Sequence, residues 1–114
     1  MSEEGEIRIF DALNWIRDNA PKYAKAKAER VYLEEFRKTK KALLMQDAER
    51  AGHKSAIAQE REAYAADGYA EHLKALSAAV EEEERLRWLM VAAQARIEAW
   101  RSIESSRRIE AKSL

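Results

Sequence analysis

The chain has 114 residues, and its 21 Lys and Arg balance its 21 Asp and Glu, so 37% of it is charged while the formal net charge is zero. The absence of cysteine excludes disulfide frameworks and thiolate chemistry. No run approaches the roughly 18 apolar residues of a membrane span, and the acidic first residues are unlike a secretory signal peptide, so a cytoplasmic protein is expected. The 22 alanines and few large aliphatic residues predict long helices that bury their apolar faces in an oligomer.

The first predicted helix covers residues 7–20, where apolar residues recur at three- and four-residue spacings. Pro21 is expected to end it, because proline disfavours a helical conformation of the residue before it. Pro21 can also open the next helix, 22–51, since its missing N–H falls among donors that lack a helical partner anyway. Gly52 then stands at the usual left-handed cap position.

A broken connector, 52–68, is expected to contain a short helix, 56–65, capped by Ser55. The last predicted helix covers 69–108, and no glycine or proline interrupts it. Its apolar stripe has a step close to the roughly 3.5 residues of a left-handed coiled coil. The stripe comprises Tyr69, Leu73, Leu76, Val80, Glu83, Leu86, Met90, Ala93, Ile97, Trp100 and Ile103. Only Glu83 is charged, and we expect it to set the register of the two arms by pairing with a Lys or Arg of the other arm.

Further apolar residues on the last helix lie off that stripe, which indicates a second apolar face. The predicted oligomer interface comprises the off-stripe residues Trp88, Leu89 and Val91, together with Trp100 of the stripe. The sequence therefore predicts a single all-α domain: a long antiparallel helical hairpin with a short N-terminal helix, assembled into a homo-oligomer.

The zero net charge conceals a segregation along the chain. Residues 1–21 sum to −3, residues 22–41 to +5, residues 42–95 to −4 and residues 96–114 to +2. In a hairpin of the predicted arms, the two basic segments would lie at one end of the molecule.

The densest basic cluster is Arg37 to Lys41, and aromatic residues are interleaved with the basic ones. Charge for phosphates together with ring faces for bases is the combination that sequence-independent single-strand binders use. The candidate nucleic-acid-binding residues are Lys22, Lys25, Arg37, Lys38, Lys40, Lys41, Arg101, Arg107 and Arg108. The alternative is a solvated helix face, in which Glu34 and Lys38 form an ordinary (i, i+4) pair.

No catalytic or metal-binding constellation is found. His53 and His72 have no metal-ligand spacing around them. The four carboxylates of Glu81 to Glu84 point around a helix and cannot converge on one proton or ion. No phosphate-binding loop or nucleophile–base set occurs. We therefore expect no enzymatic activity, no cofactor and no metal.

The segment from Pro21 to Met45 resembles small phage and prophage proteins, and the layout of the chain resembles phage recombination mediators of the UvsY type. The matching features are the Lys40-Lys41 step, the glycine-containing break at Gly52 and Gly68, and the long C-terminal helix that begins with a tyrosine. The resemblance implies a helical hairpin that assembles into a ring, binds single-stranded DNA through basic residues and helps to load a recombinase. A recombinase or a single-strand binding protein would then be its protein partner, in the host cytoplasm.

Two functions therefore stand as expectations. The first is a non-enzymatic phage-type accessory protein that binds single-stranded DNA as a homo-oligomer. The alternative is a coiled-coil structural or adaptor protein, or a phage inhibitor of a host protein, that binds no DNA.

Overall fold

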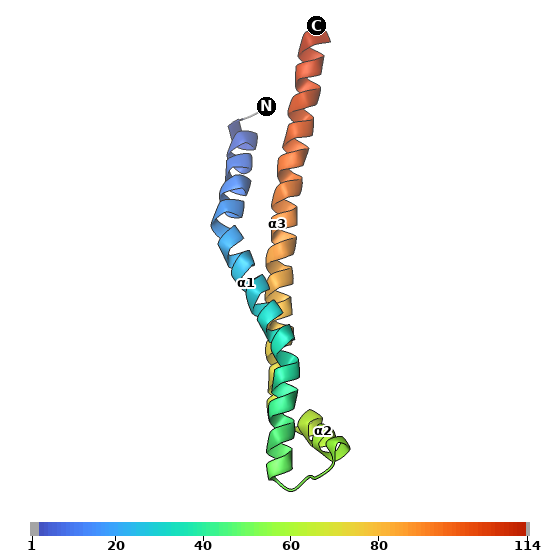
Figure 1. Ribbon diagram of the computed structural model, residues 1–114. Coiled ribbons are helices and arrows are strands. Elements are labelled where there is room, and N and C mark those ends of the chain that lie inside the picture. The colour runs from blue at the N-terminus through green and yellow to red at the C-terminus, as the bar shows by residue number, and fades with distance from the viewer. Residues whose placement is uncertain (1–2, 114) are drawn as a thin grey trace. The chain divides into compact units, whose positions relative to one another are not determined.

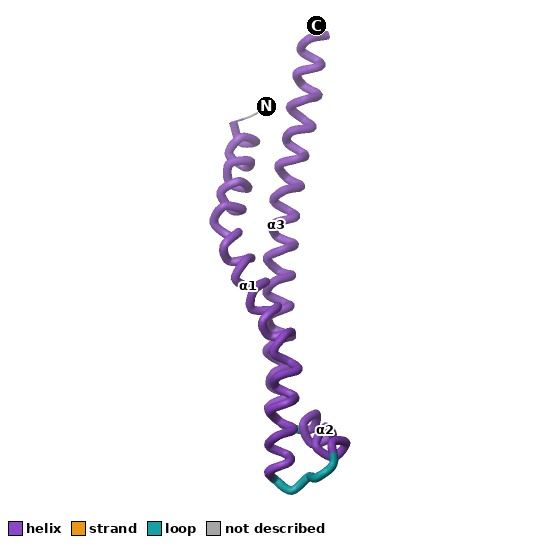
Figure 2. Tube along the Cα trace, viewed as in Figure 1, coloured by secondary structure: helices purple, strands orange, loops and turns teal. Residues whose placement is uncertain are grey.

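The computed structural model describes residues 3–113, and within that range it is helical and contains no strand (Figures 1 and 2). Helix α1 comprises Glu3–Arg50, α2 Ala56–Ala65 and α3 Asp67–Ser113. The predicted all-α helical hairpin is confirmed, with α1 and α3 as its antiparallel arms. The prediction about the acidic first residues falls partly on residues 1 and 2, which lie outside the described range.

The predicted break at Pro21 is wrong. Helix α1 continues through Pro21, so the expected short helix at 7–20 is the first part of a helix of 48 residues. An interior proline removes one backbone donor and crowds the carbonyl four residues earlier, here that of Arg17, at a cost of about 3 kcal/mol, so the helix-forming residues on both sides outweigh this cost. One turn earlier, the Asn19 side chain donates a hydrogen bond to the Trp15 carbonyl at 2.8 Å, which adds a polar contact beside the proline.

The end of α1 agrees with the sequence. Gly52 has a φ of 107°, in the region that favours glycine. The amide of Gly52 donates to the Glu49 carbonyl at 3.1 Å, and the amide of His53 donates to the Ala48 carbonyl at 3.1 Å. These two bonds form a Schellman motif, which satisfies carbonyls that the helix end would otherwise leave unpaired.

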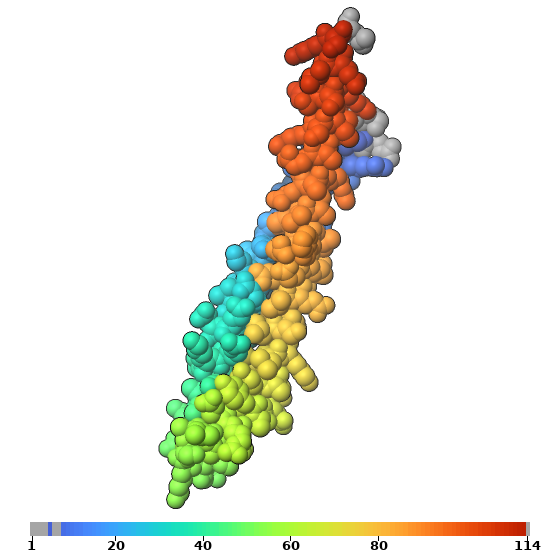
Figure 3. Space-filling model, turned by 90° about the vertical axis from the view of Figure 1, so that its right-hand side faces the viewer, coloured from blue at the N-terminus to red at the C-terminus, as the bar shows by residue number. Residues whose placement is uncertain are grey.

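Helix α2 has the predicted bounds and the predicted cap. The Ser55 hydroxyl accepts a hydrogen bond from the Ala58 amide at 3.1 Å, and Ser55 has an extended backbone. Ala63, on the inner side of α2, is completely buried. Figure 3 shows the atoms of this connecting region, in green to yellow, gathered with the adjoining ends of the two long helices.

The chain divides into two compact units, and the long helices contribute to both. Unit 1 comprises residues 1–24 and 84–114, and unit 2 comprises residues 25–83. The core of unit 1 includes Ile9 and Ala12 from α1 and Leu86 and Ala93 from α3. The spacings predicted Ile9, Leu86 and Ala93, whereas Ala12 was not predicted, and the expected Phe10 and Leu13 are exposed.

In unit 2 the arms are closely spaced, and their buried residues are small or polar. Ala48 and Ala63 are buried, as are His72 and Glu83. The first half of the predicted α3 stripe is therefore shifted: His72 is 8% exposed, whereas Leu73 is 41% exposed. The predicted stripe members Val80 and Ile103 are exposed as well. The His72 ring makes a hydrogen bond to α1, which is described below.

None of the helices in residues 3–113 has the length and apolar character needed to cross a membrane.

Candidate functional site

The predicted basic residues are divided between the two units. Unit 2 holds Lys25, Arg37, Lys38, Lys40 and Lys41, and unit 1 holds Lys22, Arg101, Arg107 and Arg108. The expectation that both basic segments share one end is corrected: in unit 1, Trp100 and Arg107 of the basic C-terminal segment line a pocket with Ile9. The acidic first part of α1 occupies this place because the helix continues through Pro21 instead of beginning after it.

Lys41 is held inside unit 2. Its Nζ lies 3.5 Å from a carboxylate oxygen of Glu60 and 4.7 Å from the centre of the Tyr64 ring, both on α2. The side-chain hydrogen bond with Tyr64 raises the pKa of Lys41, and the charge of Glu60 raises it further, while partial burial acts in the opposite direction. Lys41 therefore joins α1 to α2, which reduces its availability for a phosphate.

Lys40 lies across the start of α3. A Cβ placed on Gly68 would be 3.4 Å from Cε and 3.5 Å from Nζ of Lys40, and 3.6 Å from a methyl group of Leu44. The half-buried Lys40 chain therefore packs against Gly68, at a distance where an added Cβ would be in ordinary van der Waals contact. The aliphatic part of Lys40 packs between the helices, and its ammonium group extends toward solvent.

Lys25, Arg37 and Lys38 are exposed, and no ion pair of theirs occurs within the described part of the chain. The expected Glu34–Lys38 pair does not form, because Glu34 accepts a hydrogen bond from Arg30 at 2.9 Å instead. These three cations therefore remain available to a ligand, unlike Lys41.

An aromatic pair lies on the same side of α1 as Lys25. The rings of Tyr32 and Phe36 are stacked, with centroids 5.7 Å apart and planes 15° from parallel, and Tyr32 is 62% exposed. Lys25 precedes Tyr32 by about two helical turns, so the two side chains leave nearly the same face. Arg37 and Lys38 point to other sides of the helix, as the sequence predicts.

In unit 1 two of the predicted cations have acidic neighbours. Arg101 pairs with Glu98 at 3.1 Å, and Arg107 with Glu104 at 4.0 Å, both one turn apart on α3. Such exposed pairs are weak, so they lower the local positive charge without holding the arginines rigidly. Lys22 and Arg108 are exposed.

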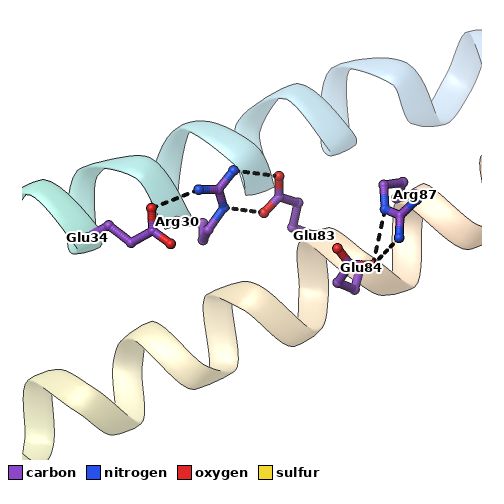
Figure 4. A network of polar contacts seen from close by, with 5 residues as sticks. All are labelled: Arg30, Glu34, Glu83, Glu84 and Arg87. Carbon is purple, nitrogen blue, oxygen red and sulfur yellow. Dashed lines mark hydrogen bonds and ion pairs between the residues drawn. The ribbon is translucent and has the colours of Figure 1, made fainter.

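A buried ion pair crosses the hairpin in unit 2, and Figure 4 shows it. The Arg30 guanidinium donates two hydrogen bonds to Glu83, from Nη2 to Oε1 at 3.1 Å and from Nε to Oε2. Its Nη1 donates a third hydrogen bond to Glu34. The hydrogen bond with Glu83 is the main reason why the pKa of Arg30 is raised, and burial opposes it. The prediction that Glu83 pairs with a cation of the other arm is confirmed.

His72 is a residue that sequence reasoning missed. Its Nε2 lies 2.7 Å from the Leu33 carbonyl of α1, where it donates a hydrogen bond, and its ring lies 6.0 Å from that of Phe36. Apolar periodicity favoured the neighbouring Leu73 for the buried position that His72 occupies. Within residues 3–113, no group of three or more His, Asp or Glu side chains could hold a metal ion.

Three of the four predicted interface residues are exposed on α3. Trp88 is 59% exposed, Leu89 43% and Val91 40%, although the Arg87 guanidinium lies 4.5 Å above the Trp88 ring. Trp100 differs: it is half-buried, on the inner face toward the first part of α1. Trp100 therefore lies on a different side of α3 from Trp88 and Val91.

Comparison with protein-family models, with curated proteins and with solved structures finds no match for this chain.

Proposed function

We propose that this protein is a non-enzymatic accessory protein that binds single-stranded DNA along α1 of unit 2. In this proposal the stacked Tyr32 and Phe36 rings receive a base, and Lys25, Arg37 and Lys38 bind phosphates. The further role in loading a recombinase is the one that the resemblance to UvsY-type mediators implies.

The observation that supports the proposal best is the exposed, stacked ring of Tyr32 on the same face as Lys25. A tyrosine that is 62% exposed contributes little to a core, whereas its open ring face is a platform on which any base can stack. Stacking on Phe36 holds the ring in one orientation, which lowers the entropic cost of receiving a base.

The balanced charge sets the strength of binding. Unit 2 contains many carboxylates, so a single copy offers only a few uncompensated cations, and its affinity is modest. Several copies on one strand would gain effective concentration, which converts weak contacts into stable binding. The homo-oligomer that we propose is therefore part of this function.

The test is a titration of labelled oligothymidylate with the full chain. With three phosphate contacts, log affinity should fall with log salt at a slope of about −2 per bound copy. Tyr32→Ala should weaken binding about tenfold, Tyr32→Phe should retain it, and Lys25→Gln should reduce the salt slope. Lys74→Gln, an exposed lysine of α3 in the same unit, is the matched control and should change little.

Two results would count against the proposal. One is the absence of binding at about 50 mM salt, where nonspecific contacts are strong. The other is equal binding by Tyr32→Ala and wild type, which would assign the affinity to diffuse charge.

A second candidate is a structural or adaptor protein that acts through helix association, and the outer face of α3 in unit 1 favours it. Trp88 and Val91 expose apolar surface on the side of α3 away from buried Leu86, and the exposed Leu89 lies between the two sides. The occupant that we propose is a second copy. An antiparallel two-fold pairing centred near residue 90 would place Leu89 of each copy against Val91 of the other, and Trp88 over the small Ala92.

Light scattering separates the two candidates. Trp88→Ala should shift the protein toward monomer if this face mediates self-association, and Ala substitution of exposed Ile57 on α2 is the control. A stable oligomer that ignores oligonucleotide would favour the adaptor. A wild-type monomer at high concentration would exclude it.

A further inference from the structure

Unit 1 contains a pocket between the first part of α1 and the last part of α3 that neither proposed function uses. Its volume is about 270 Å³. Its floor is apolar and consists of Ile9, Ala99, Trp100 and Ile103. Ile9 is buried, whereas Ile103 is half exposed, so the floor is open to a ligand from one side.

The rim of the pocket is basic. Arg8, Arg96 and Arg107 line it, and the lining side chains that the structure describes include no carboxylate. Glu104 is the nearest acid recorded, at 4.0 Å from Arg107, and both Arg8 and Glu104 take part in further polar contacts. Among the lining side chains that the structure describes, Arg96 is an exposed guanidinium of the rim.

A buried donor adds to this pattern. The indole Nε1 of Trp100 is inaccessible to solvent and has no hydrogen-bond partner among the described residues. A buried unpaired donor is costly, and a ligand that supplies an acceptor would remove the cost. The polar groups that line the pocket are thus all donors: three guanidinium groups around an indole N–H.

We propose that this pocket binds an acidic peptide segment of a partner protein, which inserts one large apolar side chain between flanking Asp or Glu residues. The apolar floor accepts the side chain, and the arginine forks bind carboxylates in bidentate geometry. A peptide fits better than a nucleic acid, because the floor is aliphatic and its one aromatic ring is half-buried, so no open ring face is available for a base. This site lies in unit 1 and is independent of the Tyr32 platform in unit 2.

The test uses Trp100 as its own reporter. Trp15→Phe and Trp88→Phe leave Trp100 as the one tryptophan of the full chain. A short blocked peptide of alternating Glu and Leu should bind saturably and shift the Trp100 emission. Peptides of alternating Glu and Ser, or of Lys and Leu, should not, since each lacks one half of the proposed recognition.

Arg96→Gln with Arg107→Gln should weaken binding of the Glu–Leu peptide at least about fivefold and reduce its salt dependence. The matched control is Arg101→Gln with Arg108→Gln, on the same helix but outside the pocket, and it should bind as wild type does. Circular dichroism establishes that each variant is folded. If a variant does not fold, the comparison of the three peptides against the protein with an unsubstituted rim still decides the proposal.

Three results would overturn the proposal. They are equal binding of the Glu–Ser peptide, equal binding by the double Arg96 and Arg107 variant, and competition by oligothymidylate for the Trp100 signal. The last would assign the pocket to nucleic acid. Failure of DNA binding at Tyr32 leaves this result unaffected, so the two proposals fail separately.

Discussion

Arg30 of α1 and Glu83 of α3, which are 53 residues apart in the sequence, form a two-pronged ion pair across the hairpin of unit 2. Glu83 is 7% exposed, and the same guanidinium also binds Glu34. A charged group at a core position specifies register, because sliding one helix along the other would leave the carboxylate buried without its cation.

Glu83→Ala should destabilise the protein clearly more than Glu81→Ala, the matched control on the exposed side of α3. The reason is that Arg30 would lose its main partner while it stays half-buried. Arg30→Met combined with Glu83→Leu should recover most of the loss, since an apolar pair of similar size carries no desolvation cost. Thermal unfolding by circular dichroism measures both. Additive effects of the single substitutions would contradict a coupled pair.

Leu86→Ala should cost about 2–4 kcal/mol of unfolding free energy, because Leu86 is 2% exposed in the core of unit 1. Leu89→Ala, at an exposed position three residues later, should cost under about 1 kcal/mol when the protein is dilute. Urea unfolding gives both values. Similar losses at both positions would mean that the outer face of α3 is covered even in dilute solution.

The two connector glycines should respond to alanine in opposite directions. Gly52→Ala should destabilise by about 1 kcal/mol, because its φ of 107° is strained for a residue with a Cβ. Gly68→Ala should be neutral or stabilise by up to about 1 kcal/mol, since Gly68 lies in α3 and its nearest neighbour is the flexible end of Lys40. The denaturant midpoints of the two variants and of the wild type measure both effects. A large loss at Gly68 would show that Lys40 cannot move aside.

Stability should fall above pH 10 in part through Lys41. The folded state raises the pKa of Lys41 above its ordinary value of 10.5, chiefly through the hydrogen bond with Tyr64. This contribution is complete below the unfolded pKa and is lost as the pH rises through the folded one. Lys41→Gln should therefore flatten the alkaline decline of the melting temperature, whereas Lys74→Gln should not. Parallel declines in wild type and Lys41→Gln would refute the assignment.

Much of the architecture could be predicted because its determinants are local. Ser55 and Gly52 marked helix ends through side-chain and backbone chemistry that needs no distant residue. The helix over Leu86, Met90 and Ala93 followed from spacing alone. Glu83 was recognisable as a paired core residue because it was the one charge in an apolar stripe.

The candidate site was predicted less well. Lys40 and Lys41 belonged to the densest basic cluster, yet one packs against Gly68 and the other binds Glu60 and Tyr64. Helical spacing gives the direction of a side chain but not what lies there. The same limit explains why Trp100, a member of the apolar stripe, was also assigned to the oligomer interface, and why the pocket it lines with Arg8 and Arg96 was not foreseen.

By itself the sequence determined the helical hairpin, its caps and the need for a cation opposite Glu83, because these follow from helical periodicity, backbone conformation and the cost of a buried charge. The tertiary structure alone decided that α1 continues through Pro21, that Arg30 is the cation, that His72 is buried instead of Leu73, and which lysines remain exposed. These outcomes depend on contacts between residues far apart in the chain, and which of these contacts form is decided by how the helices pack.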